Sequence, residues 1–264
     1  MPQQSPKIIA IANQKGGVGK TTTTINLGAS LAEQGQKVLI VDLDPQGNAS
    51  TGLGIDPESR VTTTYDVLLD EANPRDAMHQ TATPNLSIIP TNTDLSSADM
   101  ELLSNEKRSF LLHDALRVPD LDPFDFVLID CPPSLNLLTV NALMAAHSVL
   151  VPLQSEFFAL EGLSQLMMTI REVRQIGNTE LRLEGVVLTM VDLRNNLSQQ
   201  VEQDARDNLG ELVFDTIVPR NVRLSEAPSF ALPVLEYDTY SKGAAAYRAL
   251  AEEILENNGM ATGG

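Results

Sequence analysis

A glycine-rich stretch near the start of the chain constrains its fold more than any other feature. Residues 8–12 are a short apolar run typical of a buried strand, and a helix is predicted to open at about Gly19. The intervening segment and the first turn of that helix read Lys15-Gly16-Gly17-Val18-Gly19-Lys20-Thr21-Thr22. The pattern departs from the usual Gly-x-x-x-x-Gly-Lys-[Ser/Thr] phosphate loop because Gln14 stands where the first glycine is expected. The order strand, loop and helix predicts a phosphate-binding turn in an α/β protein.

The residue types in this loop suit the binding of ATP. Gly16, Gly17 and Gly19 let the backbone curl so that successive N–H groups point inward, and the helix N-terminus adds a positive dipole end. We expect Lys20 to reach the β- and γ-phosphates, and Thr21 to place its hydroxyl on Mg²⁺. A glycine-rich turn before an ordinary helix is the alternative, and the demanding strand-loop-helix context disfavours it.

Two later strands are expected to bring aspartates to the same place. Residues 37–42 form a buried strand that leads to Asp44, and residues 124–130 form another that ends at Asp130. Ligands bind outside the carboxyl ends of strands in open α/β sheets. We therefore expect Asp130 to hold Mg²⁺, directly or through water, and Asp44 to lie near the metal and orient the attacking water. For Asp44, an Asp-Pro turn without chemistry remains the alternative.

The pattern of the whole chain predicts one α/β domain over residues 1–264, with a doubly wound, mostly parallel sheet flanked by helices. No separate N-terminal helix-turn-helix domain is expected. Further strands are predicted at residues 86–90, 148–152, 184–190 and 212–218. Helices are predicted at residues 21–34, 65–70, 101–116, 156–176, 199–209 and 243–257, with residues 196–198 opening the helix at 199.

The composition restricts the expected cellular compartment and the classes of partner, such as nucleic acid or membrane, that the protein could bind. The 264 residues carry a net charge of −17, so any contact with nucleic acid requires a local basic patch. No apolar run approaches the ~20 residues needed to span a bilayer, and the short polar N-terminus lacks a signal-peptide pattern. The single cysteine, Cys131, excludes an intramolecular disulfide and is expected to be a small buried residue. These features predict a cytoplasmic protein that does not bind membranes.

The extra lysine in the phosphate loop carries a family resemblance. Lys15, five residues before Lys20, makes the loop resemble the deviant Walker A motif Lys-Gly-Gly-x-Gly-Lys-Thr of the MinD/ParA ATPases. Three other segments resemble ParA/Soj partitioning proteins: Asp42-Leu43-Asp44-Pro45-Gln46-Gly47-Asn48, Asp130-Cys131-Pro132-Pro133 and Pro219-Arg220-Asn221-Val222-Arg223-Leu224-Ser225-Glu226-Ala227-Pro228. The resemblance implies an ATP-dependent homodimer, with Lys15 reaching the nucleotide of the other copy. It also implies that Pro219 and Asn221 line the adenine pocket.

The resemblance extends to DNA. It implies that the arginines matching Arg194 and Arg223 bind double-stranded DNA without sequence preference. Arg220, Lys242 and Arg248 complete the set of candidates for a local basic patch. For each of the five, a solvated or ion-paired side chain is the alternative.

The resemblance leaves three candidate functions, of which the cysteine count disfavours the third. The resemblance favours a nucleoid-associated chromosome-partitioning ATPase with slow intrinsic hydrolysis, stimulated by a ParB/Spo0J-type centromere-binding protein. The alternative is a MinD-like or ParA-like ATPase that positions a protein cargo or works on a membrane scaffold, although the C-terminal helix lacks the basic amphipathic pattern of MinD. A redox ATPase like the nitrogenase iron protein needs cluster cysteines, which one cysteine cannot supply.

Overall fold

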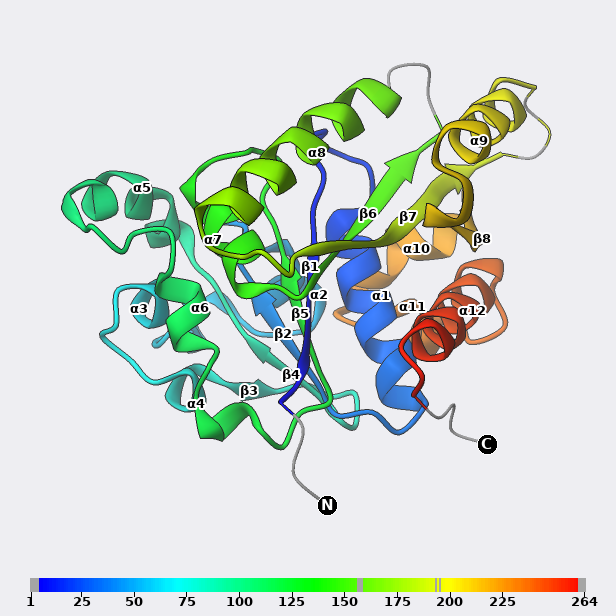
Figure 1. Cartoon of the computed structure of the whole chain (residues 1–264). Helices are drawn as coiled ribbons and strands as arrows, with labels where there is room; N and C mark the ends of the chain where they lie inside the picture. Colours follow the sequence, from blue (N-terminus) through cyan, green and yellow to red (C-terminus); the bar gives the residue numbers. More distant parts are fainter. Residues whose placement is uncertain (1–4, 156–158, 193, 195, 261–264) are drawn as a thin grey trace.

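One sheet organises the protein, and helices cover both of its faces (Figure 1). The computed structural model describes residues 5–155, 159–192, 194 and 196–260. Within them, eight strands lie in the order β3-β4-β2-β5-β1-β6-β7-β8. Every neighbouring pair is parallel except β3 with β4. The prediction of a doubly wound, mostly parallel sheet is confirmed.

The strands are β1 (Lys7–Ile11), β2 (Val38–Asp42), β3 (His79–Gln80), β4 (Leu86–Ile89), β5 (Phe126–Asp130), β6 (Ser148–Gln154), β7 (Arg182–Val191) and β8 (Val213–Pro219). The longer helices are α1 (Lys20–Glu33), α7 (Leu137–Ala145), α8 (Ala159–Ile176), α9 (Asn196–Leu209) and α12 (Lys242–Asn257). Short helices are α2 (Asn48–Gly52), α3 (Thr64–Leu68), α4 (Pro74–Ala77), α5 (Ala98–Glu101), α6 (Leu111–Ala115), α10 (Val222–Glu226) and α11 (Val234–Tyr237).

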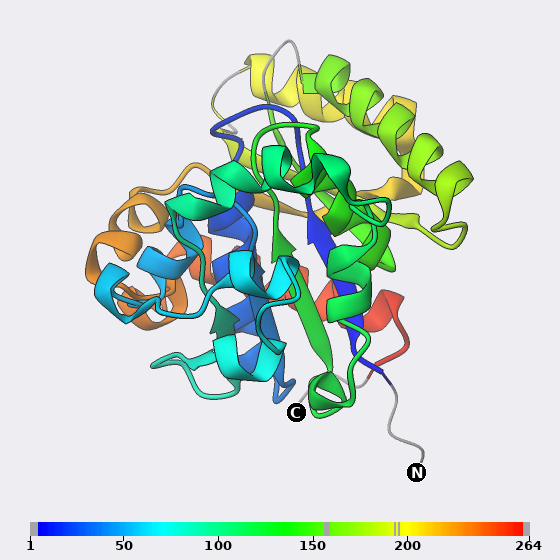
Figure 2. The same cartoon turned by 90° about the vertical axis from the view of Figure 1, so that its left-hand side faces the viewer.

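The central strands β1, β2 and β5 are apolar except at their ends, because both faces of the sheet are covered. Along β1, Ile8 and Ala10 join the hydrophobic cluster that includes α7 and α8, whereas Ile9 and Ile11 join the cluster that includes α1 and α12. Figure 2 shows the two helical layers from the side. Successive side chains of a strand point to opposite faces, so one short apolar run serves two cores.

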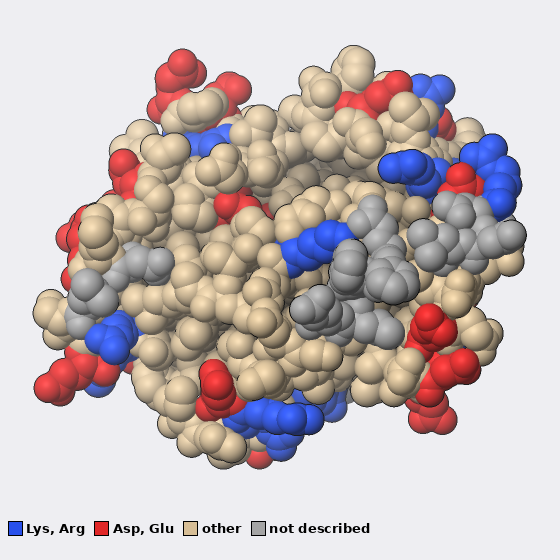
Figure 3. All heavy atoms as spheres, turned by 90° about the horizontal axis from the view of Figure 1, so that it is seen from above, with Lys and Arg blue, Asp and Glu red and all other residues tan. Residues whose placement is uncertain are grey.

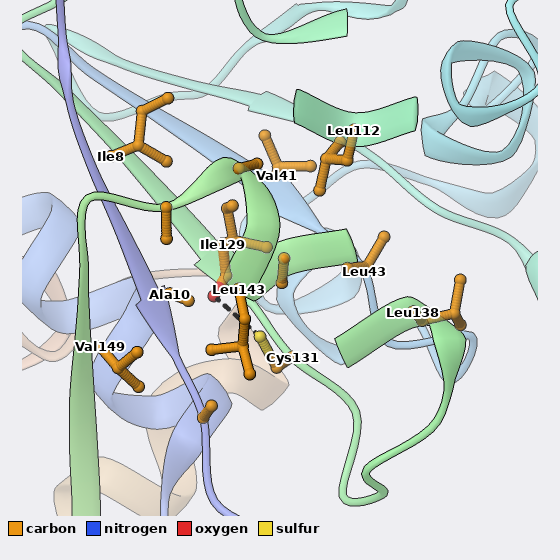
Figure 4. Packing of buried hydrophobic residues seen from close by; sticks show 14 of the residues in the cluster. Ile8, Ala10, Val41, Leu43, Leu112, Ile129, Cys131, Leu138, Leu143 and Val149 are labelled. Carbon is orange, nitrogen blue, oxygen red and sulfur yellow. Dashed lines mark hydrogen bonds between the residues drawn. The ribbon is translucent and has the colours of Figure 1, made fainter. Parts of the chain in front are cut away.

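Cys131 lies in the first of these cores, as expected. It is buried directly after β5, among Ile129, Leu143 and Ala10 (Figure 4). Its thiol lies 3.8 Å from the carbonyl oxygen of Ile129. Burial raises the pKa of this thiol, so Cys131 behaves as a small apolar side chain.

The prediction of one helix over residues 101–116 is wrong. α5 ends at Glu101, a 3-10 turn covers Leu102–Ser104, and α6 occupies only Leu111–Ala115. Between them the side-chain oxygen of Asn105 accepts a hydrogen bond from the backbone N–H of Lys107 at 2.8 Å. Asparagine competes in this way for backbone groups that a helix would use, which interrupts the helix.

Among the elements that were not predicted are one buried helix, α7, one short strand, β3, and several helices of four or five residues. Most side chains of α7 are buried, so this helix lacks the polar face that makes helical periodicity visible in a sequence. β3 is only two residues long and antiparallel to β4. None of the helices in the described part of the chain combines the length and the apolar character required to cross a bilayer.

Candidate functional site

The glycine-rich loop joins β1 to α1 at the carboxyl end of the sheet. Gly17 and Gly19 adopt positive φ values of 73° and 88°, a left-handed conformation that glycine reaches without steric strain. Gly19 is the N-cap of α1, and no side chain caps the N–H groups of this helix end. The first turn of α1 also carries no acidic residue. The loop therefore presents backbone N–H groups and a helix dipole that favour an anion.

Contacts with two distant strands hold this loop in place. The Asn13 amide donates to the carbonyl of Pro152 at 2.7 Å and accepts from the N–H of Lys15 at 3.0 Å. On the other side, the Thr189 hydroxyl donates to the carbonyl of Val18 at 2.8 Å. β6 and β7 thus fix the loop before any ligand arrives. Sequence reasoning missed Asn13 and Thr189 because their roles depend on partners far along the chain.

Lys20 begins α1 and is almost fully enclosed. Only 6% of the residue is exposed, and its Nζ donates to the carbonyl of Lys15 at 3.1 Å. Burial lowers the pKa of Lys20, while the nearby Asp130 charge opposes that shift. Lys15 itself is half-buried at the start of the loop. Lys20 therefore supplies a positive charge beside the loop, as the spacing predicts.

Asp130 and Asp42 lie opposite each other at the ends of the neighbouring strands β5 and β2. Asp130 accepts hydrogen bonds from the hydroxyls of Thr21 at 2.8 Å and Thr24 at 3.0 Å. Asp42 accepts from the N–H of Ser50 at 2.8 Å and from its hydroxyl at 2.6 Å. The predicted meeting of Thr21 with Asp130 is thus present, whereas the Asp42–Ser50 pair was not predicted.

The buried carboxylates repel one another, so a nearby positive charge would stabilise their ionised forms. Burial raises the pKa of Asp130, and the neighbouring charge of Asp42 adds to the rise. Burial also raises the pKa of Asp42, against the hydrogen bonds from Ser50. Asp44 follows in the next loop with 7% of the residue exposed, and its carboxylate accepts from the N–H of Gln46 at 3.0 Å. A cation at this edge of the sheet would relieve the electrostatic repulsion.

A cavity of about 350 Å³ opens beside the loop. Its wall contains Gly19 from the loop and Thr22 from the first turn of α1, together with Pro219 at the end of β8 and Asn221 just after it. The structure therefore brings the two residues proposed for adenine binding next to the phosphate loop. The other lining residues include Arg220, which the sequence proposed for DNA binding. They also include Thr189, Met190, Leu224, Pro228 and Tyr247, which were not proposed as site residues.

The basic candidates are more dispersed than the sequence suggested. Arg194 and Arg220 follow the adjacent strands β7 and β8, and Arg223 lies on α10. Lys242 begins α12, whereas Arg248 pairs with Glu33 at the end of α1. Figure 3, which views the molecule from above, shows Lys and Arg side chains beside Asp and Glu side chains at its right.

Three of the five candidates are already ion-paired within the chain. The Arg194 guanidinium contacts the Asp192 carboxylate at 3.0 Å and lowers the pKa of that carboxyl to about 2. Arg223 contacts Glu226 at 2.8 Å and Asp238 at 3.1 Å. Among the described residues, Arg220 and Lys242 form no ion pair within 4.0 Å.

A family model described as an AAA domain matches residues 6–183. The chromosome partitioning protein ParA of Caulobacter vibrioides is 57% identical over 250 residues, which cover 94% of each protein. The sporulation initiation inhibitor protein Soj of Bacillus subtilis is 50% identical over 251 residues, covering 95% of this chain and 99% of Soj.

Solved structures of similar proteins support the relationship that the sequence comparisons indicate. A Mycobacterium smegmatis protein, described as cobyrinic acid a,c-diamide synthase with bound ADP and magnesium, is 41% identical with a TM-score of 0.84. That match covers 97% of this chain and 98% of the other. The cell division ATPase MinD of Pyrococcus furiosus is 31% identical with a TM-score of 0.79, covering 95% and 98%. Sequence identity, coverage and the deviant phosphate loop together show that the chain belongs to the ParA/Soj family of chromosome-partitioning P-loop proteins.

Proposed function

We propose that this chain is a DNA-partitioning ATPase that binds nonspecific double-stranded DNA as an ATP-bound homodimer. The observation that carries the proposal is the meeting of Lys20, Thr21 and Asp130 at a pre-formed phosphate loop. The family relationship supports chromosome partitioning as the purpose of that chemistry, since ParA and Soj relatives cover nearly the whole chain.

The residues at the loop fit ATP and magnesium. Thr21 and Asp130 offer hard oxygen atoms, which Mg²⁺ prefers, and Asp44 remains a further candidate at the same edge. No group of three or more His, Cys, Asp or Glu in the described residues could hold a metal alone. This suits Mg²⁺, which takes several ligands from water and phosphate. When bound, the ion would offset negative charge on the phosphates.

Hydrolysis would depend on the chain's own charged groups. Lys20 and the loop N–H groups would stabilise the charge of the β- and γ-phosphates. Asp44, almost buried beside them, would orient and polarise the attacking water. Among the described residues we identify no glutamine or arginine that would assist it, and we infer slow hydrolysis by the purified protein.

Dimerisation and DNA release complete the proposed cycle. Lys15 of one copy would reach the nucleotide held by the other copy, so ATP would join the two. The dimer would bind nucleoid DNA through Arg194, Arg220 and Arg223, whose positions near the carboxyl ends of β7 and β8 support a common patch. A ParB/Spo0J-type centromere-binding protein would stimulate hydrolysis and release the dimer.

The second candidate is a positioning ATPase for a protein cargo or a membrane scaffold. The similarity to the cell division ATPase MinD supports it. The C-terminal helix argues against a lipid-binding version, because α12 has Glu252, Glu253 and Glu256 near its end. Anionic lipids attract basic amphipathic helices, and this charge pattern is the opposite.

Retention on DNA tests the proposal directly. The protein is incubated with immobilised nonspecific DNA in the presence of ADP or a non-hydrolysable ATP analogue, across a series of salt concentrations. We expect retention only with the analogue, weakening steeply with salt because phosphate contacts release counterions. The Lys20→Ala variant is the nucleotide-binding control. Binding to anionic liposomes without DNA retention would favour the second candidate, and a monomer saturated with the analogue would contradict the dimer.

A further inference from the structure

Arg60 is a buried, positively charged residue that has no role in the ATPase cycle proposed above. It lies between a 3-10 turn (Pro57–Ser59) and α3, and 9% of the residue is exposed. Its guanidinium donates to the carbonyl of Ile55 at 3.1 and 2.7 Å, to the carbonyl of Thr91 at 3.1 Å and to the hydroxyl of Thr51 at 2.8 Å. All these acceptors are neutral. In the described part of the chain no carboxylate forms an ion pair with this guanidinium within 4.0 Å, and Asp42 and Asp56 act on it only from a longer distance. Burying a cation without a direct ion pair costs free energy, so these contacts require an explanation.

The contacts of Arg60 surround the loop that carries Asp44. Gly47 has a positive φ of 62°, and a Cβ atom added there would lie 2.7 Å from Nη1 of Arg60. The guanidinium therefore packs directly against the backbone of Gly47. In turn, the N–H of Gly47 donates to the carbonyl of Asp44 at 2.8 Å. The N–H of Gln46 donates to the Asp44 carboxylate at 3.0 Å.

A second set of contacts fixes the same loop from the sheet. Asp42, at the end of β2, binds both the N–H and the hydroxyl of Ser50 on α2. The Ser50 hydroxyl also accepts from the N–H of Thr91 at 3.1 Å. Thr91 therefore uses its N–H for Ser50 and its carbonyl for Arg60. The segment from Asp44 to Thr51 is held at both ends by one connected network.

We propose that Arg60 is a positioning residue for Asp44. Its planar guanidinium fixes the backbone of Gly47 and the end of α2, and through them the direction of the Asp44 carboxylate. Its charge also attenuates the repulsion among the carboxylates at this edge, since the Asp42 charge is the main electrostatic partner of Arg60. The inference rests on the proposed role of Asp44 in hydrolysis.

Single-turnover hydrolysis of ATP by Arg60→Gln tests the inference. Glutamine removes the charge and most of the donors, so the loop loses its fixed geometry. We expect hydrolysis at least about tenfold slower, because small misplacements of a catalytic group cost large factors in rate. The Kd for ATP should change less than about threefold, since Arg60 touches none of the phosphate-loop residues. Arg75→Gln, on the exposed surface of α4, is the matched control and should hydrolyse ATP at the wild-type rate.

Thr51→Val provides the second variant, which keeps Arg60 and the shape of residue 51 but removes one acceptor. We expect hydrolysis to slow by about threefold and the melting temperature to fall by about 2–4 °C, because one N–H of the buried guanidinium loses its acceptor. The Kd for ATP should stay unchanged. This variant carries the test if Arg60→Gln does not fold. Hydrolysis within twofold of wild type in the folded variants would overturn the inference. So would equal losses of ATP affinity and rate, which indicate a general structural defect.

Asp44→Ala distinguishes failure of the inference from failure of the proposed function. If Asp44→Ala hydrolyses ATP normally, the role of Asp44 is wrong and Arg60 has no carboxylate to position. If Asp44→Ala is inactive while Arg60→Gln and Thr51→Val hydrolyse normally, only the inference about Arg60 fails.

Discussion

The hydroxyl of Thr21 donates a hydrogen bond to the Asp130 carboxylate at 2.8 Å, although the two residues are 109 positions apart. Thr21 belongs to the first turn of α1, and Asp130 ends β5, which pairs with β1. The hydroxyl proton points to Asp130, so the lone pairs of the oxygen remain for a cation. One geometry can therefore hold the apo site together and accept magnesium.

Removing this carboxylate should weaken the magnesium dependence of nucleotide binding. In Asp130→Asn, we expect the ratio of ATP affinities measured with magnesium and with EDTA to fall about tenfold, because the charge that attracts the ion is lost. Asp204→Asn, on the exposed surface of α9, is the control and should keep the wild-type ratio. An unchanged ratio in Asp130→Asn would exclude Asp130 from the metal site.

Lys20→Ala should weaken ATP binding by about ten- to a hundredfold, the loss expected for charge-assisted hydrogen bonds to phosphate. Equilibrium titration with a fluorescent ATP analogue measures the change. Lys37→Ala, an exposed lysine just before β2, is the control. Wild-type affinity in Lys20→Ala would refute the phosphate-loop assignment.

Asp44→Ala should bind ATP with wild-type affinity and hydrolyse it about a hundredfold more slowly, because general-base assistance contributes 10²–10⁴-fold in enzymes. An ATP-bound dimer should therefore accumulate, and size-exclusion chromatography with ATP detects it. Asp94→Ala, with an exposed carboxylate after β4, is the control. Normal turnover in Asp44→Ala would show that another group activates the water.

Arg220→Ala should weaken binding to nonspecific DNA more than Arg223→Ala does. Arg223 must give up its contacts with Glu226 and Asp238 before it can bind a phosphate, and in the described structure Arg220 has no ion pair to break. Each lost phosphate contact should reduce the slope of log affinity against log salt by about one. Arg75→Ala is the surface control, and the Kd for ATP is measured alongside because Arg220 also lines the cavity beside the phosphate loop. Equal slopes for wild type and Arg220→Ala would remove Arg220 from the DNA interface.

His147 should make the protein less stable at mildly acidic pH. Its Nδ1 accepts the N–H of Ile8 at 2.9 Å, and burial, with the charges of Arg117, Lys7 and Arg182, lowers the pKa of His147 to about 4. The unfolded chain, with an ordinary pKa near 6.5, binds the proton more readily. Stability therefore falls as the pH drops below 6.5 and stops falling near 4.

Denaturant unfolding at pH 7.5 and pH 5 measures this contribution of His147. Between these two values the free energy of unfolding should fall by about 1 kcal/mol more in wild type than in His147→Gln, a figure reduced for partial solvent screening. The comparison cancels other titrating groups, including Asp42 and Asp130, whose raised pKa values act in the opposite direction. Parallel changes in the two proteins would contradict the prediction.

The sequence by itself determined the phosphate loop, the strands that end in Asp42 and Asp130, and the doubly wound class of the fold. These features are local: glycines with positive φ, an uncapped helix start and short apolar runs follow from neighbouring residues. It failed at residues 101–116, where the Asn105 side chain takes a backbone N–H from the helix, and at α7, where burial on most sides hides the period.

Only the tertiary structure decided which hydrogen bonds fix the site residues and which of the described basic side chains are free of ion pairs with acidic neighbours. Asn13 with Pro152, Thr189 with Val18, and Arg60 with Thr91 join residues between 31 and 171 positions apart. No pattern of spacing encodes such pairs, because they form only where the fold brings distant segments of the chain together. The pairing of Arg194, Arg223 and Arg248 with acidic neighbours is likewise a property of the folded surface. Neighbouring residues in the sequence are enough to define the phosphate-loop motif. The orientation of its side chains and the balance of charge around them are set only when distant strands meet at one edge of the sheet.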